Sequence, residues 1–296
     1  MKSDFVRIFE MGPRDGLQNE KQLITTSDKV HLVDLLSQCG FEKIEVTSFV
    51  NPKWVPQMAD AADVLAAITR VPGVAYSALT PNLKGYERAI SAGVDEVAVF
   101  ASATESFSQK NLNCSIAESL QRFVPLVQAA KSDGVPVRGY VSCVAGCPYE
   151  GEVAPSQVAQ VVEQLMLLGC YEISLGDTIG SGRPETIAAM LSASLQIAPA
   201  DKLAGHYHDT NGRALDNIQV SLEQGLRVFD TAIAGLGGCP FAPGAKGNVA
   251  TGPVVEMLQS LGYTTGINLP ALSTAEQFAQ ECIRKNNNSI KTGNAL

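Results

Sequence analysis

The chain has 296 residues, of which 45% are hydrophobic and 18% charged, and its formal net charge is −8. This length and apolar content allow one large domain with a sizeable core, and they exclude a disordered or low-complexity chain. An acidic chain is poorly suited to general nucleic-acid binding, because phosphate contacts need clustered lysine and arginine, so a small-molecule partner is favoured.

Short β-rich segments alternate with longer helical segments along most of the chain. The predicted strands cover residues 5–11, 43–48, 74–79, 94–101, 136–143, 171–176, 203–208 and 228–233. The predicted helices cover residues 27–39, 57–70, 82–92, 115–133, 155–169, 184–197, 212–225 and 249–261, with one further helix at 270–285. This makes eight strand–helix pairs of about 32 residues each, the size of a βαβ step.

Helix start and stop signals support this division. Ser115 precedes the fourth helix and Glu118 follows three residues later, which fits a capping box. Glycines stand just past five helix ends, where a left-handed C-cap suits them: Gly40, Gly93, Gly134, Gly169 and Gly225. The recurring order of helix, glycine and strand predicts a parallel sheet with right-handed crossovers.

The fold predicted from these units is α/β, a closed (βα)8 TIM barrel. A doubly wound open sheet usually has fewer strands and a phosphate-binding G-x-G-x-x-G after the first strand, which is absent here. We find no Pro/Ser-rich linker, so residues 1–296 are predicted to form a single catalytic barrel domain. It carries an extra C-terminal helix and a glycine-rich active-site loop at 235–248, and the polar residues 287–296 are predicted to be a flexible tail.

The seven cysteines are scattered, and their odd number in a large domain indicates reduced thiols. The N-terminus lacks the apolar or Arg/Ser-rich character of a signal or transit peptide. No window has about 18 uninterrupted apolar residues, so no membrane span is expected. We therefore predict a cytoplasmic protein.

Two histidines at the end of the seventh strand are the most informative local feature. His206 and His208 are separated by one residue, so on a strand both imidazoles share a face. Asp15 and Asn248 can add oxygen ligands from the loops after the first and eighth strands. Such a mixed N/O set without thiolate suits Mg²⁺ or Mn²⁺ better than structural Zn²⁺. The alternative is an ordinary polar strand end.

The loop GLGGCPFAPGAKGN, residues 235–248, holds five glycines and two prolines. It is either a tight barrel-closing connection or a mobile lid. Cys239 lies inside it and outside any apolar run, so we expect a chemical role for this thiol. Cys143 and Cys147 have a spacing that is too loose for a convincing redox pair, and we interpret them as structural.

Several stretches of the chain resemble the 3-hydroxy-3-methylglutaryl-CoA lyase family, within a wider group of barrel metallolyases and Claisen-type synthases. They are GPRDGLQNE (12–20), EVTSFVNPKWVPQMAD (45–60), RGYVSC (138–143), SLGDTIG (174–180), GHYHDTNGRALDN (205–217) and AGLGGCPFAPGAKGN (234–248). Related synthases typically carry a polar residue where this chain has Leu17, and often a C-terminal regulatory domain. One departure concerns Gly252, where family members commonly carry an acidic residue.

The resemblance implies roles for particular residues. The implied metal ligands are Asp15, His206, His208 and Asn248; the implied catalytic groups are Arg14, Asp177 and Cys239, supported by Glu45; and Lys21, Lys110, Asn111 and Arg138 lie in segments on the CoA side. It also implies a divalent metal cofactor (Mg²⁺ or Mn²⁺), an acyl-CoA substrate, no nucleic-acid or membrane partner, and a homo-oligomer, either a dimer or a tetramer.

The implied activity is that of an oxo-acid-lyase of class EC 4.1.3. It would cleave 3-hydroxy-3-methylglutaryl-CoA to acetyl-CoA and acetoacetate by retro-Claisen chemistry, a step of leucine catabolism. Asp177 or a nearby histidine would take the hydroxyl proton, Arg14 would stabilise the enolate, and Cys239 would protonate the product carbanion. The alternatives are a lyase for citramalyl-CoA or an isoprenoid-branched hydroxyglutaryl-CoA, a condensing enzyme, and a metal-binding barrel without catalysis.

Overall fold

The computed structural model describes residues 4–20, 22–238 and 247–293, with side-chain detail through residue 284. Eight strands of this part of the chain close into a barrel in the order β1-β2-β3-β4-β5-β8-β9-β10, and every neighbouring pair is parallel. These strands are β1 (Arg7–Glu10), β2 (Lys43–Ser48), β3 (Ala75–Leu79), β4 (Glu96–Ser102), β5 (Val137–Ser142), β8 (Glu172–Asp177), β9 (Leu203–Tyr207) and β10 (Val228–Thr231). The predicted (βα)8 TIM barrel is confirmed.

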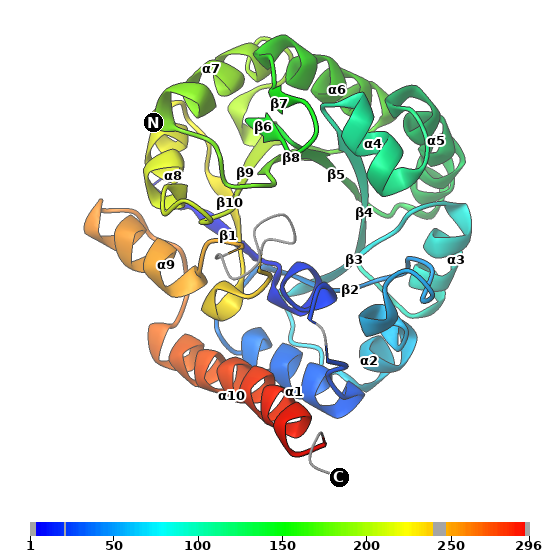
Figure 1. Ribbon diagram of the computed structural model, residues 1–296, viewed down its shortest axis with the longest axis vertical. Helices are drawn as coiled ribbons and strands as arrows, with labels where there is room; N and C mark the ends of the chain where they lie inside the picture. Colours follow the sequence, from blue (N-terminus) through cyan, green and yellow to red (C-terminus); the bar gives the residue numbers. More distant parts are fainter. Residues whose placement is uncertain (1–3, 21, 239–246, 294–296) are drawn as a thin grey trace.

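A ring of helices surrounds the strands (Figure 1). They are α1 (Thr26–Ser37), α2 (Ala61–Ala67), α3 (Leu83–Ser91), α4 (Glu105–Leu112), α5 (Ile116–Asp133), α6 (Pro155–Leu168), α7 (Pro184–Ser194), α8 (Ala214–Glu223), α9 (Thr251–Ser260) and α10 (Leu269–Gly293). Short helical turns are η1 (Gly12–Gly16), η2 (Pro56–Met58), η3 (Ala200–Lys202) and η4 (Ile233–Gly235), and a small hairpin pairs β6 (Gly146–Cys147) with β7 (Gly151–Glu152).

Local chemistry explains where several helices begin and end. The Ser115 hydroxyl accepts a hydrogen bond from the Glu118 N–H, and the Glu118 carboxylate accepts one from the Ser115 N–H, which is the predicted capping box. Gly134 and Gly169 end α5 and α6 with φ of 70° and 115°. Residues with a Cβ rarely adopt that conformation, so glycine is favoured at these ends.

The core has two parts. The larger cluster packs the outer face of the strands against the helices, while Phe9, Met11, Leu79, Ala98 and Tyr140 form a smaller apolar group inside the barrel. This division follows from the strand period, because alternate residues point inward and outward. Two members of this interior group, Leu79 and Tyr140, line the cavity at the C-terminal ends of the strands.

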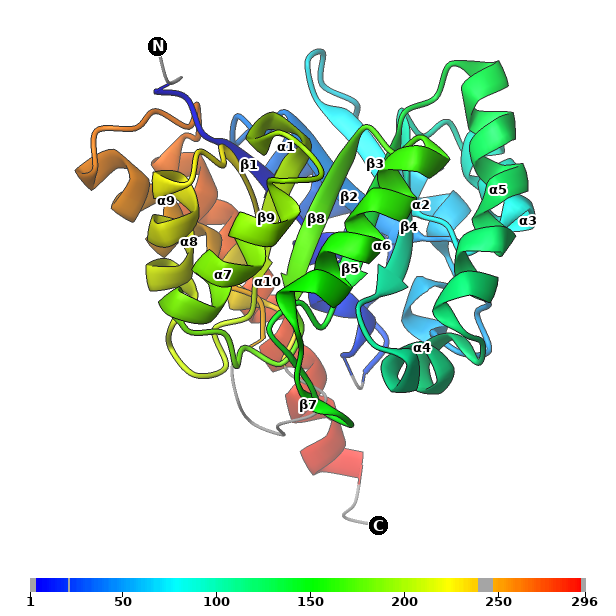
Figure 2. The ribbon, with the colours of Figure 1, turned by 90° about the horizontal axis from the view of Figure 1, so that it is seen from above.

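Four elements differ from those predicted. Helix α4 and the β6–β7 hairpin were not predicted, and α2 is shorter than 57–70 because Pro56 begins a separate turn. Helix α10 runs to Gly293 and not to 285, since no proline or glycine interrupts it after Pro270, so most of the predicted tail is helical. Figure 2 shows α4, β7 and the end of α10 at the same end of the barrel.

Among the described residues, no helix combines the length and the apolar character that crossing a bilayer requires.

Candidate functional site

A cavity of about 700 Å³ opens at the C-terminal ends of the barrel strands. Its buried inner end is formed by residues that include Arg14, Leu79, Tyr140, Ser174 and His208. Its outer end is formed by exposed residues: Asn51, Trp54, Asn82, Asn111 and Arg122. The cavity therefore reaches from the inside of the barrel to solvent.

Asp15, His206 and His208 meet at the inner end of this cavity. Each offers one ligand atom, and these atoms lie within 4.8 Å of one another. The Asp15 Oδ2 is 3.8 Å from the His206 Nε2 and accepts a 2.8 Å hydrogen bond from the Asn248 amide. An isolated β-bridge between His208 and Asn248 brings the eighth-strand loop to this point. The four predicted metal ligands are thus neighbours.

The donor set fits a divalent cation. The Nδ1 of His208 is buried and has no hydrogen-bond partner among the described residues, so this nitrogen is not engaged by the protein. Burial lowers the His208 pKa to about 4, so the ring is neutral and able to coordinate. Burial opposes ionisation of Asp15, but Arg14 and the two histidines outweigh it and lower the Asp15 pKa to about 2.

Asp230 on β10 fixes the orientation of His206. Its Oδ2 lies 3.2 Å from the His206 Nδ1, and both carboxylate oxygens accept hydrogen bonds from Arg138. The Ser174 hydroxyl donates a further 2.7 Å hydrogen bond to Oδ2. Burial opposes ionisation of Asp230, but Arg138 outweighs it and holds the Asp230 pKa well below its ordinary value. Such a carboxylate behind a metal-ligating imidazole sets its tautomer.

Arg14 lies between two carboxylates at the wall of the cavity. Its Nε donates to Glu45 on β2, and its Nη1 is 2.5 Å from the Asp15 Oδ1. The Tyr140 hydroxyl donates a 3.1 Å hydrogen bond to the other Glu45 oxygen. The guanidinium is thereby held in one orientation at the cavity wall, and a fixed cation there is suited to stabilising an oxyanion.

Glu10 holds two site segments together from behind the barrel wall. Its Oε1 accepts hydrogen bonds of 2.7 Å from the N–H groups of Gly12 and Ile233, and its Oε2 accepts one of 2.8 Å from the Thr251 hydroxyl. Gly12 begins the turn that carries Arg14. Burial raises the Glu10 pKa to about 7, although these hydrogen bonds act in the opposite direction.

The departure at Gly252 has a structural counterpart on α10. The half-buried Glu276 carboxylate accepts a hydrogen bond from the Gly252 N–H, and a Cβ at Gly252 would lie 3.0 Å from the Glu276 Oε1. The C-terminal helix therefore places a carboxylate beside the position where this chain lacks one.

Asp177 is not among the described residues that line the cavity, and its role as a proton acceptor stays a prediction. Its oxygens accept hydrogen bonds from the Ser181 and Gly182 N–H groups, at 3.1 and 2.8 Å. Gly176 does line the cavity, so strand alternation turns Asp177 to the opposite face. Asp177 holds the β8–α7 turn, and burial raises its pKa to about 6.

Arg138 does not lie on the CoA side, and that assignment is corrected. Its side chain is 0% exposed inside the barrel, where it bridges Glu172 and Asp230. Its guanidinium also packs over the Phe9 ring at 4.5 Å. As an inward-facing residue near the start of β5, it is separated from the mouth by the inner apolar layer.

The remaining predicted residues fall into two groups. Asn111 on α4 lines the cavity, whereas the neighbouring Lys110 is exposed and does not. Lys21 and Cys239 lie outside the described residues. The two ends of the loop that carries Cys239 meet beside Asp15, because a Cβ at Gly247 would lie 1.2 Å from the Gly237 carbonyl oxygen. Both glycines are therefore required at the base of the loop.

The electrostatic character of the cavity differs from that of the whole chain. Among the described lining residues, Asp15 is the only carboxylate, and Arg14 and Arg122 are the cations. Neutral amides of Gln18, Asn19, Asn51, Asn82 and Asn111 form much of the remaining polar wall. The net charge of −8 is thus carried elsewhere, and the cavity can accept an anionic ligand.

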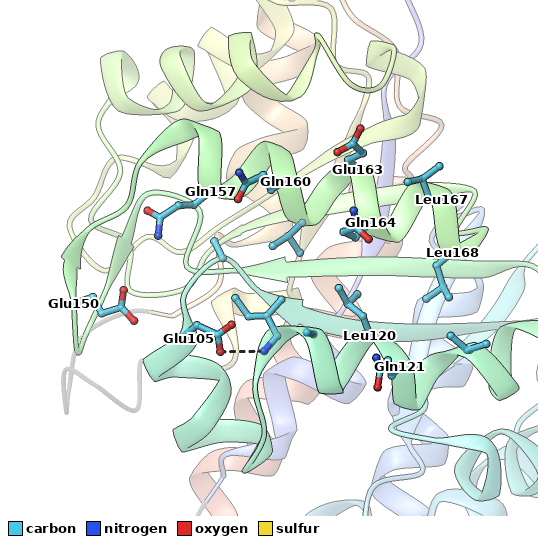
Figure 3. Close-up of a pocket in the computed structure, with 15 residues that line it drawn as sticks. Glu105, Leu120, Gln121, Glu150, Gln157, Gln160, Glu163, Gln164, Leu167 and Leu168 are labelled. Atoms are coloured by element: carbon cyan, nitrogen blue, oxygen red, sulfur yellow. Dashed lines mark hydrogen bonds between the residues drawn. The ribbon is translucent and has the colours of Figure 1, made fainter.

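A second hollow of about 810 Å³ lies between α5 and α6 on the outside of the barrel (Figure 3). Leu120, Leu167 and Leu168 give it an apolar strip, and Glu105, Glu150 and Glu163 give it acidic edges. It contains none of the predicted site residues, so the chemistry belongs to the cavity at the barrel mouth.

Sequence reasoning missed Asp230, Glu10 and Glu276. A charged residue in the middle of an apolar barrel strand, as in VFDTAI and RIFEM, is a signal that identifies the first two. No local signal identifies Glu276, because its partner Gly252 lies on another helix.

A family model described as HMGL-like matches residues 5–279. The chain is similar to the crystal structure of the HMG-CoA lyase from Brucella melitensis, with a TM-score of 0.94 and 61% identity over 95% of this chain and 99% of that chain. It is also 56% identical over 284 residues to a Pseudomonas aeruginosa protein named 3-hydroxy-3-isohexenylglutaryl-CoA/hydroxy-methylglutaryl-CoA lyase, covering 96% of this chain and 95% of that protein.

A more distant match includes a bound ligand in its description. It is an HMG-CoA lyase from Acinetobacter baumannii in complex with coenzyme A and 3-methylmalate. The TM-score is 0.90 at 36% identity, over 95% of this chain and 92% of that chain.

Proposed function

Because this chain belongs to the HMGL-like family, we propose that it is a divalent-metal-dependent carbon–carbon lyase that cleaves 3-hydroxy-3-methylglutaryl-CoA to acetyl-CoA and acetoacetate. The observation that carries the proposal is the meeting of Asp15, His206 and His208 beside Arg14 in one cavity. The lyases from Pseudomonas aeruginosa and Brucella melitensis are 56% and 61% identical to the chain across nearly its whole length.

Asp15, His206, His208 and Asn248 would hold the metal ion, which we propose to be Mg²⁺ or Mn²⁺. When bound, the ion supplies Lewis-acid stabilisation of a substrate hydroxyl and carboxylate. The protein side of this task is orientation: Asp230 fixes His206, and Asn248 fixes Asp15. A pre-oriented set of ligands leaves the remaining positions to an oxygen-rich substrate.

Arg14 is the group that we propose for the thioester oxygen. The substrate hydroxyl must give up its proton, and we propose Asp177 or a nearby histidine as the acceptor. Cleavage of the C–C bond then forms the ketone of acetoacetate and leaves negative charge on the enolate of acetyl-CoA. A fixed guanidinium stabilises that charge as it develops. Burial disfavours the charged form of Arg14, but Glu45 and Asp15 outweigh it and keep the Arg14 pKa above its ordinary value. Glu45 and Tyr140 then act as positioning residues for Arg14.

Cys239 is the proposed acid for the last step, on the basis of the sequence. Its thiol would donate a proton to the carbon of the enolate, which completes acetyl-CoA. A thiol near its reference pKa of about 8.5 is mostly protonated at neutral pH and can serve in this way. The glycines at the base of its loop lie against Asp15 and Asn248, next to the reacting groups.

An isoprenoid-branched hydroxyglutaryl-CoA is a second candidate substrate. The Pseudomonas aeruginosa relative is named for both a methyl- and an isohexenyl-substituted substrate. Gly252 also favours this second substrate, because it stands where methylglutaryl-CoA lyases commonly carry an acidic residue.

A panel of hydroxyacyl-CoA thioesters with Mg²⁺ or Mn²⁺ tests the proposal. Release of acetyl-CoA with the highest kcat/KM on the 3-hydroxy-3-methylglutaryl thioester supports the proposal. A higher kcat/KM on another thioester would show that the enzyme acts on that acyl group instead. Arg14→Gln and Cys239→Ala variants that fold and keep full turnover would contradict the residue assignments.

We also propose that residues 1–296 act as one catalytic domain in a cytoplasmic homo-oligomer, a dimer or tetramer. Light scattering coupled to size-exclusion chromatography measures the assembly directly.

A further inference from the structure

Trp54 is the only tryptophan of the chain, and its side chain is 70% exposed at the outer end of the cavity. An indole is large and apolar, and leaving it in water forgoes the free energy of burial. Exposed tryptophans at the rim of a ligand cavity are therefore candidates for a contact that forms only with ligand.

The loop between β2 and η2 holds the Trp54 backbone in place. The N–H groups of Trp54 and Val55 both donate to the Asn51 carbonyl oxygen, at 2.9 and 3.2 Å, and the Lys53 N–H donates to the Asn51 side chain at 3.0 Å. The indole therefore projects from a braced turn at the cavity mouth.

The walls of the cavity suit the arm of an acyl-CoA. Between the metal ligands and Trp54 they combine apolar groups with side-chain amides, including Asn51, Asn82 and Asn111. Amides can donate and accept hydrogen bonds, as the two amides of a pantetheine arm require. With the acyl group at the metal ligands, the pantetheine arm would run along this wall toward solvent.

Among the described residues that line the outer end, Arg122 is the cation and none is a carboxylate. Lys53, the residue before Trp54, is exposed but is not one of the lining residues. Arg122 donates one 3.3 Å hydrogen bond to the Leu112 carbonyl oxygen and lies near the exposed Glu118. Guanidinium and ammonium groups beside an aromatic platform are suited to a base joined to phosphates.

Resting on the proposed function, we propose that Trp54 is the adenine-binding residue of this site, stacking its indole on the base of the CoA while Arg122 and Lys53 face the phosphates. This names the subsite for the nucleotide end of the substrate. Stacking of a base on an aromatic side chain corresponds to about a 5- to 100-fold change in affinity.

Fluorescence tests the contact without any catalytic step, because the emission of the single tryptophan reports on Trp54 alone. We expect CoA and adenosine 3′,5′-bisphosphate to quench this emission and pantetheine to leave it unchanged, with excitation at the red edge to avoid adenine absorbance. Quenching by pantetheine to the same extent as CoA, or no quenching by the bisphosphate at saturation, overturns the proposal.

Kinetics with a truncated substrate supply the second measurement. Trp54→Ala should raise KM for the acyl-CoA by about 5- to 100-fold, and Trp54→Phe should restore most of the affinity. The rise should shrink when the substrate is the matching acyl-pantetheine, which lacks the base. Leu23→Ala is the matched control, because Leu23 is 65% exposed and does not line the cavity.

The two proposals fail in different ways. If calorimetry shows that the protein does not bind CoA at all, the proposed function fails. If CoA binds but Trp54 fluorescence is unchanged, or if Trp54→Ala alters only the oligomeric state, this inference fails and the proposed function stands.

Discussion

The Nδ1 of His206 lies 3.2 Å from the Oδ2 of Asp230, and its Nε2 faces Asp15 at 3.8 Å. The imidazole is thus held between two carboxylates of different function, one behind the metal site and one within it. Asp230 also neutralises the buried Arg138, so one side chain connects the structural ion pair of the barrel interior to the chemistry at its mouth.

Asp230→Asn should weaken metal binding by about 10- to 100-fold, because the amide no longer fixes the His206 tautomer. Binding of Mn²⁺ measured by paramagnetic resonance checks this without turnover. Ser174→Ala is the control, since it removes a neutral hydrogen bond to the same carboxylate. Equal Mn²⁺ affinity in Asp230→Asn and the wild type would show that the orientation of His206 comes from elsewhere.

Arg138→Met should lower the free energy of unfolding by about 3–5 kcal/mol, because Asp230 and Glu172 are left buried and unpaired. Denaturant unfolding measures this loss. If Arg138 contacted CoA, the main effect would instead be a rise in KM with little loss of stability, and that outcome would restore the original assignment. Asn111→Ala, in the cavity wall, supplies the comparison for a direct effect on KM.

The barrel was predictable because each strand–helix unit carries its own local signals. Capping boxes, C-terminal glycines and apolar strands act over a few residues, as at Ser115 and Gly169. The metal cluster was also predictable, since a barrel brings the ends of its strands together and His206 and His208 share a strand face.

What could not be predicted depends on side-chain direction and on distant pairs. Arg138 and Asp177 lie in the segments that the resemblance marked, but the direction of each side chain follows from its place on the strand. The Arg138 side chain points into the barrel and pairs with Asp230, and the Asp177 side chain binds the turn after its strand. Glu276 acts on Gly252 across two helices, and no spacing in one sequence reports such a contact.

Glu10→Gln should change how stability depends on pH. The folded state raises the Glu10 pKa from 4.5 to about 7, so it binds the proton more tightly than the unfolded chain. The contribution is fully present below pH 4.5 and is lost as pH rises to about 7. The stability of the wild type relative to Glu10→Gln should therefore fall by about 3 kcal/mol across that window.

Unfolding of both proteins at a series of pH values measures this difference. Other titrating groups, including His208 with its lowered pKa, cancel in the comparison. A constant difference from pH 4.5 to 7 would mean that Glu10 stays ionised throughout, supported by the N–H groups of Gly12 and Ile233.

Glu45→Gln should reduce kcat by about 10²- to 10³-fold, because Arg14 loses the charged partner that orients it toward the enolate. The same substitution at Glu96, which pairs with Lys43 away from the cavity, is the matched control. A loss confined to KM in Glu45→Gln would indicate that Arg14 acts in ground-state binding and not on the developing charge.

Gly252 and Glu276 should behave as a coupled pair. The N-cap of α9 is Ala250, whose side chain cannot accept a hydrogen bond, and the Glu276 carboxylate accepts one from the Gly252 N–H instead. A carboxylate at a helix N-terminus is also favoured by the helix dipole. Glycine leaves the space that this contact needs, since a Cβ would lie 3.0 Å from the Glu276 Oε1.

Gly252→Ala alone should therefore give little or no stabilisation, because the helix propensity it gains is offset by displacement of Glu276. In a Glu276→Ala background the same substitution should stabilise the protein by about 0.5–1 kcal/mol, the ordinary gain of alanine over glycine in a helix. The difference between the two backgrounds is the coupling energy, which a double-mutant cycle of unfolding free energies measures. Gln277→Ala, an exposed neighbour on α10, should show no coupling to Gly252. Equal effects of Gly252→Ala with and without Glu276 would mean that the carboxylate does not cap α9.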